Sequence, residues 1–295
     1  MAEFCATNQT AMKFLLLSLF LYSFHFSLRA QTVLETPQAN SILYTGPGDD
    51  QPLIVGLGGS EGRNAWASDH WKTTRDRFLE SGYAFLAIGY FGAPGTPDTL
   101  NRISLNAIHD AILKAAGNQK INKKKIAIIG GSRGGDLALL LGSYFSDITC
   151  VVAIVPSHVT FPGHTGHFST AAWTYNGKEL PYVPVNEAAV PALMKRDLRG
   201  AFEAMLKDSA AEQLAMIPVE RIKGPVLLLS ATEDEICPST LMCEKMEDRF
   251  RQHQFPYRTE HIAVQGGHAA PLTRFDTVFA FLDKYFKASP SRPRR

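Results

Sequence analysis

Short apolar runs alternate with amphipathic stretches along most of the chain. Strand-like apolar runs occur at residues 53–57, 84–90, 125–129, 150–155, 225–230 and 258–264. Apolar residues recur with helical spacing between or after these runs, over residues 63–81, 101–116, 134–145, 239–254 and 271–286. Strands buried on both faces form continuous apolar runs, and intervening helices allow neighbouring strands to run parallel. The pattern predicts an α/β fold, in which helices cover both faces of a mostly parallel central sheet.

The alternation is interrupted once, between the apolar runs at 150–155 and 225–230. The intervening segment is rich in proline, histidine and aromatic residues, and residues 188–213 have a helical pattern. So long a segment inside a compact domain usually has a function of its own. We expect an insertion at about residues 156–223 that covers a site at the sheet edge and forms a pocket wall.

The motif Gly-Gly-Ser-Arg-Gly at residues 130–134 lies between the apolar run 125–129 and the helical pattern 134–145. A G-x-S-x-G motif at a strand-to-helix turn is the nucleophile elbow of an α/β-hydrolase. The serine sits in a strained conformation, and the flanking glycines leave room for the turn to close. Ser132 is the predicted nucleophile, and the backbone N–H of Arg133 is a predicted oxyanion-hole donor.

The same pattern occurs earlier, as Gly-Gly-Ser-Glu-Gly at residues 58–62 after the apolar run 53–57. In an α/β-hydrolase, the loop after an early strand supplies oxyanion-hole amides, and the elbow follows two strands later. The order of the motifs therefore predicts Gly59 or Ser60 as the second oxyanion donor. The alternative, with Ser60 as the nucleophile, reverses the two assignments.

The acid and the histidine should follow the serine in that order. Acidic residues cluster at 233–235 after the run 225–230, and Gly266-Gly267-His268 follows the run 258–264. Loops at the carboxyl ends of parallel strands converge, so Ser132, Asp234 and His268 can meet as a catalytic triad. Glu233 is the alternative acid, and we otherwise expect Glu233 and Glu235 to be solvated loop charges.

Other histidines are assigned structural roles. His158, His164 and His167 crowd one segment, but a closed zinc site needs four ligands with tighter spacing. We expect a pocket-lining loop there, and we expect His261 to pack within or pair across its strand. The sequence predicts no metal and no cofactor.

Composition and charge suit one independent domain. The chain has 295 residues, 45% hydrophobic residues and a net charge of +2. We expect the domain to span residues 46–288, followed by a short basic tail at 289–295. The balanced charge does not favour a nucleic-acid partner. Three cysteines lie beyond the amino-terminal segment, and a bridge between Cys237 and Cys243 is conceivable.

The amino end has the pattern of a secretory signal. Lys13 is followed by a short apolar core at 14–22 and by a more polar stretch that closes at Ala30. We expect residues 1–30 to be a presequence, with Met12 as a possible start. Removal of this presequence yields an exported protein without a stable membrane span. The alternative is a buried amino-terminal helix, which predicts a cytoplasmic protein.

Residues from about 53 to 271 resemble the catalytic domain of the acyl-CoA thioesterase / bile acid-CoA:amino acid N-acyltransferase family. The resemblance rests on the motif at 58–62, on the segments 81–92, 131–136 and 217–229, and on the Gly-Gly-His loop at 266–268. It places the family's nucleophile, acid and histidine on Ser132, Asp234 and His268. Members that transfer acyl groups to amino acids use cysteine, so a serine favours hydrolysis. Ala231 and Cys237 replace a glycine and a tryptophan that the resemblance leads us to expect. We also expect no room before the first core strand for the amino-terminal β-sandwich of the family's eukaryotic members.

The residues and the resemblance together predict a serine hydrolase that cleaves acyl thioesters through an acyl-serine intermediate. The expected partner is a small-molecule acyl thioester or ester, and the oligomeric state is not predicted. Two alternatives are a secreted carboxylesterase or related ester or amide hydrolase, and a non-catalytic binding protein on a hydrolase scaffold.

Overall fold

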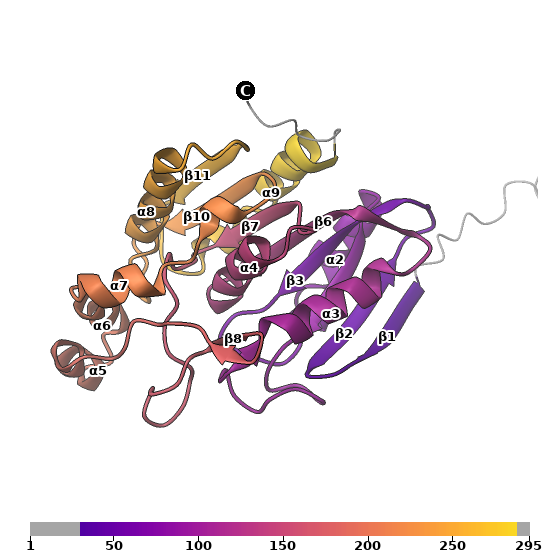
Figure 1. The fold of residues 1–295 in the computed structure, drawn as a ribbon. Coiled ribbons are helices and arrows are strands. Elements are labelled where there is room, and N and C mark those ends of the chain that lie inside the picture. The colour runs from indigo at the N-terminus through magenta and orange to yellow at the C-terminus, as the bar shows by residue number, and fades with distance from the viewer. Residues whose placement is uncertain (1–29, 288–295) are drawn as a thin grey trace, which may run out of the picture.

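The computed structural model describes residues 30–287 and is built around an eight-stranded sheet (Figure 1). Its strands are β1 (Ala30–Thr36), β2 (Ala39–Thr45), β3 (Gln51–Leu57), β4 (Ala84–Gly89), β6 (Ile121–Gly131), β7 (Cys150–Ile154), β10 (Val226–Ala231) and β11 (Thr259–Val264). The spatial order is β1-β2-β4-β3-β6-β7-β10-β11. Strand β2 is antiparallel to both β1 and β4, and every other pair in the sheet is parallel.

Helices cover both faces of this sheet (Figure 1). One face carries α3 (Leu105–Ala116), α4 (Arg133–Tyr144) and α8 (Ser239–Gln252), and the other carries α2 (Lys72–Glu80) and α9 (Phe275–Leu282). Alternate strand residues feed two separate cores, because successive side chains of a strand point to opposite faces. Leu53 and Val55 of β3 belong to the α3–α4 side, whereas Ile54 belongs to the side of α2 and α9.

The segment between β7 and β10 forms a small lobe beside the sheet (Figure 1). It contains strands β8 (Trp173–Tyr175) and β9 (Lys178–Glu179), which form a three-stranded sheet with β5 (Ile103–Ser104), and helices α5 (Val190–Met194), α6 (Leu198–Met205) and α7 (Ser209–Ala215). The helical pattern expected over 188–213 is divided because Asp197 and Asp208 cap new helices. Their carboxylates accept hydrogen bonds from Gly200 N at 2.8 Å and Ala211 N at 3.0 Å.

All six predicted strands are present. Short helical turns occur beside the longer helices: the 3-10 turns η1 (Ala65–Ala67), η2 (Glu187–Ala189), η3 (Val219–Arg221) and η4 (Ala270–Thr273), and the π-helical turn η5 (Asp283–Lys287). The stretch expected to be helical over 63–81 becomes regular only at Lys72, after η1. Strands β1 and β2 were not expected. They lie before residue 46, where the domain was expected to begin, and they add two strands to one edge of the sheet.

Residues 1–29 of the expected presequence (1–30) and the whole expected tail (289–295) lie outside the described residues, whereas Ala30 is already part of β1. No helix within residues 30–287 is long and apolar enough to cross a membrane. The conceivable bridge between Cys237 and Cys243 is not formed, since both cysteines are free and buried.

Candidate active site

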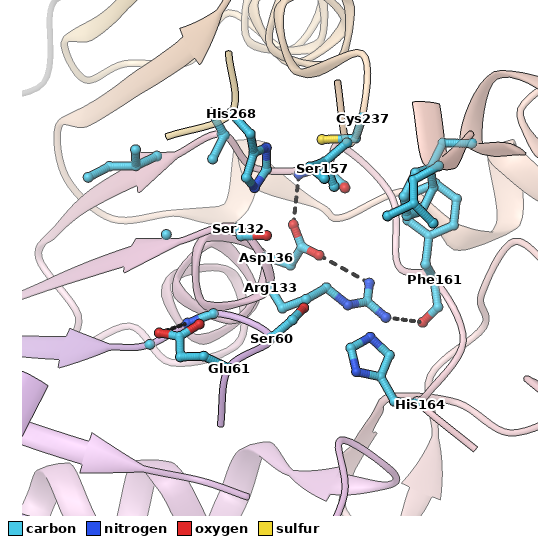
Figure 2. A pocket seen from close by; sticks show the side chains of 18 of the residues that line it. Ser60, Glu61, Ser132, Arg133, Asp136, Ser157, Phe161, His164, Cys237 and His268 are labelled. Carbon is cyan, nitrogen blue, oxygen red and sulfur yellow. Dashed lines mark hydrogen bonds and ion pairs between the residues drawn. The ribbon is translucent and has the colours of Figure 1, made fainter. Parts of the chain in front are cut away.

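Ser132 occupies a strained turn between β6 and α4. Its backbone angles are φ 52° and ψ −122°, a region that non-glycine residues rarely adopt. The backbone N–H of Ser132 donates to Ile154 O at 2.8 Å, which ties the turn to the neighbouring strand β7. The sharp turn therefore holds one serine at the carboxyl edge of the sheet, where it lines a cavity (Figure 2).

Two glycines of the motif at 130–134 are required by close backbone contacts. A Cβ atom at Gly130 would lie 1.9 Å from Gly134 O, and one at Gly134 would lie 2.3 Å from Gly58 O. At Gly131 the nearest atom to an added Cβ is Leu272 Cδ2 at 3.7 Å, an ordinary contact. The first and last glycines thus allow the elbow to close and to lie against the loop 58–62, whereas Gly131 is sterically permissive.

The loop 58–62 lies beside the elbow, as its order in the sequence predicts. A Cβ added at Gly59 would lie 3.3 Å from Ser132 Cβ, so the Gly59 backbone is next to the nucleophile candidate. Ser60 lines the same cavity, and Arg133 is the first residue of α4, where an N–H has no acceptor within the helix. The three predicted oxyanion donors therefore gather around Ser132.

A carboxylate that was not singled out from the sequence binds one of these amides. The Gly59 N–H donates to Glu61 Oε1 at 3.0 Å, and Glu61 also lines the cavity (Figure 2). Glu61 is exposed, so it sits at the solvent side of this wall. In this conformation the Gly59 amide is occupied by a negatively charged group.

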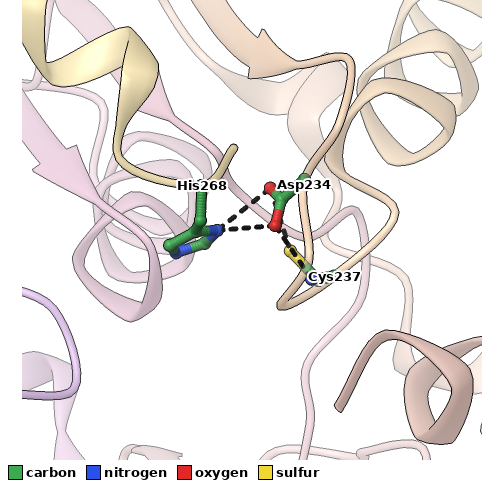
Figure 3. A group of neighbouring side chains, drawn as sticks. All are labelled: Asp234, Cys237 and His268. Carbon is green, nitrogen blue, oxygen red and sulfur yellow. Dashed lines mark hydrogen bonds and ion pairs between the residues drawn. The ribbon is translucent and has the colours of Figure 1, made fainter. Parts of the chain in front are cut away.

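Asp234 and His268 meet at the ends of two neighbouring strands. Asp234 follows β10 and His268 follows β11, and His268 Nδ1 lies 2.9 Å from Asp234 Oδ1 and 3.0 Å from Oδ2 (Figure 3). Asp234 is fully buried and also accepts hydrogen bonds from Ser239 Oγ at 2.6 Å and from Cys237 N at 3.0 Å. Burial alone would raise the pKa of Asp234, but the hydrogen bonds from His268, Ser239 and Cys237 hold that pKa below its ordinary value. Asp234 is therefore an ionised partner for His268.

The two glutamates beside Asp234 differ from each other. Glu233 is exposed and its backbone N–H donates to Gly266 O at 2.9 Å. Glu235 is also exposed, but its Oε2 accepts a hydrogen bond from the backbone N–H of His268 at 2.8 Å. This bond lowers the pKa of Glu235. The sequence treats Glu235 as a solvated charge only, whereas its carboxylate also anchors the histidine loop.

Ser132 and His268 line one cavity of about 530 Å³. Figure 2 labels both side chains at this cavity, and no hydrogen bond between Ser132 Oγ and His268 is among those formed by residues 30–287. Catalytic hydrogen bonds commonly tighten only when substrate binds. The arrangement brings a serine, a histidine and a buried carboxylate to one place.

The insertion supplies much of the cavity wall. Its contribution is mostly apolar, with Ser157 and His164 as the polar members, and its apolar side chains include Phe161, Phe168, Val185, Leu193, Leu198, Ala201, Phe202 and Met205. Phe161 and Phe202 pack edge to face with ring centroids 4.6 Å apart, which ties the start of the insertion to α6. Trp66 and Trp71 also line the cavity. An apolar wall of this kind can accommodate an acyl chain.

A buried ion pair lies next to the nucleophile candidate. Arg133 Nη1 is 3.3 Å from Asp136 Oδ2. The guanidinium also donates hydrogen bonds to the backbone carbonyls of Phe161 and Pro162, and Figure 2 shows the one to Phe161. Asp136 Oδ1 accepts from Ser157 N at 2.7 Å. Burial raises the pKa of Asp136 to about 6, although Arg133 and the Ser157 N–H act in the opposite direction. The pair joins α4 to the first residues of the insertion.

Of the histidines at 158, 164 and 167, only His164 lines the cavity, and His261 pairs with the neighbouring strand. His158 Nε2 is 2.7 Å from Glu212 Oε1, and His164 lines the cavity, where burial lowers its pKa to about 4. His261 contacts Ser230 Oγ of the neighbouring strand at 2.8 Å. Within residues 30–287, none of His158, His164 and His167 belongs to a group of three potential metal ligands. The one such group in this part of the chain is Asp234, Cys237 and His268, which the sequence did not suggest.

Comparison with known families gives a match over more than half of the chain. The family model described as BAAT / Acyl-CoA thioester hydrolase C terminal matches residues 107–286. Among curated proteins, acyl-coenzyme A amino acid N-acyltransferase 1 of Mus musculus is 24% identical over 172 residues, which cover 58% of this chain and 38% of that protein. Acyl-coenzyme A thioesterase 1 of Rattus norvegicus is 26% identical over 172 residues, which cover 58% of this chain and 39% of the relative. The matched region thus spans well under half the length of these relatives.

Solved structures share the fold at low sequence identity. An esterase from Pyrococcus furiosus superposes with a TM-score of 0.60 at 16% identity, over 88% of this chain and 92% of the esterase. The acylaminoacyl peptidase of Pyrococcus horikoshii gives a TM-score of 0.62 at 11% identity, over 93% of this chain and 44% of the peptidase. The predicted α/β-hydrolase fold is confirmed.

Proposed function

The chain belongs to the BAAT / acyl-CoA thioester hydrolase C-terminal family, and from this premise we propose that it is a serine hydrolase that cleaves acyl thioesters through an acyl-serine intermediate. The observation that carries the proposal is that the strained Ser132 and His268 line the same apolar cavity. The Nδ1 atom of His268 is held by the buried carboxylate of Asp234. Relatives named as acyl-CoA thioesterases support the thioester as substrate class.

The chemistry assigns one role to each group. His268 Nε2 takes the proton of Ser132 Oγ as the oxygen attacks the thioester carbonyl carbon, and Asp234 holds the imidazole with Nδ1–H toward its carboxylate. The carbon–sulfur bond of the tetrahedral intermediate then breaks, and the thiolate takes the proton from His268. A water molecule, deprotonated by His268, next attacks the acyl-serine ester and releases the carboxylic acid and the serine.

The oxyanion requires donors aimed at the former carbonyl oxygen. The backbone N–H of Arg133 is one, and the N–H of Gly59 or Ser60 is the other, with Gly59 available once Glu61 moves away from its amide. One such donor typically contributes about 3–4 kcal/mol to lowering the barrier.

The first test measures release of free thiol from short-, medium- and long-chain acyl-CoAs by the full chain. Ser132→Ala should lower kcat by roughly 10⁶-fold, to the residual level that oxyanion donors and binding provide. Ser60→Ala is the matched control, because Ser60 lies in the same type of motif and lines the same cavity. Full activity of Ser132→Ala together with loss of activity in Ser60→Ala would reverse the two assignments.

A carboxylesterase is the second candidate. The solved esterase that the chain covers over nearly its whole length favours it, as does the predicted export signal, because CoA thioesters are intracellular metabolites. Cleavage of p-nitrophenyl esters without cleavage of acyl-CoAs would select this candidate. Failure of Ser132 to react with a fluorophosphonate would instead favour a non-catalytic binding protein.

Export is part of the proposal. Residues 12–30 have the charged start, apolar core and small final residue of a secretory signal. Protein recovered outside the cytoplasm of the producing cell should begin at Gln31 when its amino terminus is read by mass spectrometry. Recovery from the cytoplasm with residues 12–30 intact would overturn this part of the proposal and leave the hydrolase assignment unaffected.

A further inference from the structure

Cys237 stands beside the acid–histidine pair and has no role in the proposed reaction. Its Sγ lies 3.8 Å from Asp234 Oδ2, while His268 Nδ1 lies 2.9 Å from Asp234 Oδ1 (Figure 3). One ligand atom from each of the three residues can be chosen so that all lie within 4.8 Å of one another. Cys237 and His268 both line the cavity, so a small solute can reach them from solvent.

We propose that Asp234, Cys237 and His268 form an inhibitory binding site for a thiophilic divalent cation, of which Zn²⁺ is the representative. Sulfur, imidazole nitrogen and carboxylate oxygen are the ligands that zinc uses in proteins. Neighbouring ligand atoms of tetrahedral zinc lie roughly 3.3–3.7 Å apart. From Asp234 Oδ2 the present separations are 3.0 Å to His268 Nδ1 and 3.8 Å to Cys237 Sγ, which bracket that range, so small side-chain shifts bring both ligand atoms into it.

The carboxylate is already oriented by donors that the cation would not displace. Ser239 Oγ donates to Asp234 Oδ2 at 2.6 Å, and the backbone N–H groups of Ile236 and Cys237 donate to Oδ1 at 3.0 Å. Such outer contacts fix the geometry of a metal ligand and raise affinity. With three protein ligands, the fourth coordination position is left to water, as in open zinc sites.

Binding changes the protonation of two groups. The Cys237 thiol releases one proton to solvent as its thiolate binds Zn²⁺, and Asp234 binds as the carboxylate that it already is. His268 binds through Nδ1, so its single proton moves from Nδ1 to Nε2 and the ring stays neutral. The balance is one Zn²⁺ bound and one proton released.

The moved proton explains the inhibition. Nε2–H cannot accept the proton of Ser132 Oγ, so the metal-bound imidazole is no longer a general base. This consequence rests on the proposed function, whereas the binding of the cation does not.

The test is a calorimetric titration of the full chain with Zn²⁺, with Mg²⁺ as the hard-cation control. We expect one Zn²⁺ per chain and at least tenfold weaker binding in Cys237→Ala. The matched control is Cys243→Ala, since Cys243 is also free and buried but lies outside the cluster. Because a core variant can fail to fold, His268→Asn provides a second ligand removal at a partly exposed position.

A spectroscopic readout reports the thiolate directly. Co²⁺ bound at this site should give a thiolate-to-metal charge-transfer band in the near ultraviolet, present in Cys243→Ala and absent in Cys237→Ala. Zn²⁺ binding of equal affinity in wild type, Cys237→Ala and His268→Asn, or no binding at millimolar Zn²⁺, would overturn the proposal.

Activity separates this proposal from the preceding one. Ester hydrolysis that Zn²⁺ suppresses and EDTA restores, with the suppression weakened in Cys237→Ala relative to its own metal-free rate, supports both. Zn²⁺ binding by a chain that hydrolyses no ester or thioester retains the metal site and rejects the hydrolase. Hydrolysis without Zn²⁺ binding does the reverse.

Discussion

Glu61 places a negative charge where the proposed reaction develops another. Its Oε1 accepts the Gly59 N–H at 3.0 Å, and the Gly59 backbone lies beside Ser132. Two unit charges about 4 Å apart repel by about 1 kcal/mol in water and by about 4 kcal/mol near a protein surface. The carboxylate therefore competes with the substrate carbonyl for this amide and must move before the amide can serve as an oxyanion donor.

Replacing Glu61 should strengthen the binding of an oxyanion analogue. Glu61→Ala frees the Gly59 amide and removes the charge, so we expect roughly tenfold tighter inhibition by an acyl trifluoromethyl ketone, which forms an anionic adduct with serine. Glu61→Gln keeps an acceptor oxygen without the charge, so its affinity for the inhibitor should lie between those of wild type and Glu61→Ala. Glu233→Gln, at an exposed acid in another loop, is the control. Weaker inhibition in both Glu61 variants would mean that Glu61 instead holds the loop 58–62 in its active shape.

At the scale of elements, the sequence predicts what depends on local pattern. Continuous apolar runs identify β3, β4, β7 and β10, because burial on both faces excludes polar residues. The edge strand β11 is only partly buried, and its apolar run is correspondingly weaker. Strand β1 escapes detection because it is a mostly exposed edge strand that mixes polar and apolar residues. Its partner β2 pairs with β4 in antiparallel fashion, outside the repeating strand–helix pattern.

The site follows the same rule. The order and spacing of Ser132, Asp234 and His268 can be read from loops that must converge at the carboxyl ends of parallel strands. The contact of Glu61 with Gly59, and the proximity of Cys237 to Asp234, depend on side-chain conformations within two loops. No sequence spacing encodes those conformations, so these residues emerge only from the structure.

The elbow itself offers a prediction with an internal control. Gly134→Ala places a methyl group 2.3 Å from Gly58 O, so α4 and the loop 58–62 must separate and the oxyanion donors must shift. We expect a loss of about 1–3 kcal/mol in the free energy of unfolding. We also expect kcat to fall by a larger fraction of its wild-type value than the free energy of unfolding does. Gly131→Ala meets no atom closer than 3.7 Å and should retain both. Urea denaturation and steady-state kinetics measure the two effects, and equal behaviour of the two variants would contradict the steric account.

Helix α6 of the insertion should set the acyl-chain length. Ala201 is buried and lines the cavity, so Ala201→Phe fills space that a long chain would occupy. We expect kcat/KM to fall roughly tenfold or more for long-chain substrates and to change little for acetyl esters. Glu203→Ala, at an exposed position of the same helix that does not line the cavity, is the control. A uniform loss across all chain lengths would place the acyl chain elsewhere.

At the scale of the whole molecule, Asp136 joins helix α4 to the insertion. Its carboxylate meets Arg133 within α4 and the backbone of Ser157 at the start of the insertion, and Arg133 in turn reaches Pro162 O. The nucleophile helix and the insertion that covers the cavity therefore share one buried charged pair. When one member of a buried ion pair loses its charge, the other is left uncompensated. The protonation of Asp136 should therefore affect both the pH dependence of the free energy of unfolding and the position of the insertion.

The sign of that coupling follows from the pKa of Asp136, which burial raises from the model-peptide value of 3.8 to about 6. Between these two pH values the folded chain binds a proton that the unfolded chain has released, so the contribution of Asp136 to the free energy of unfolding decreases as pH rises through this window. The full decrease is roughly 3 kcal/mol, and it is complete above pH 6 or so. Asp136→Asn does not titrate, so urea denaturation from pH 4 to pH 7 should show wild type losing stability relative to this variant. A relative gain by wild type over the same range would mean that attraction to Arg133 outweighs burial, and that the pair strengthens the junction as Asp136 ionises.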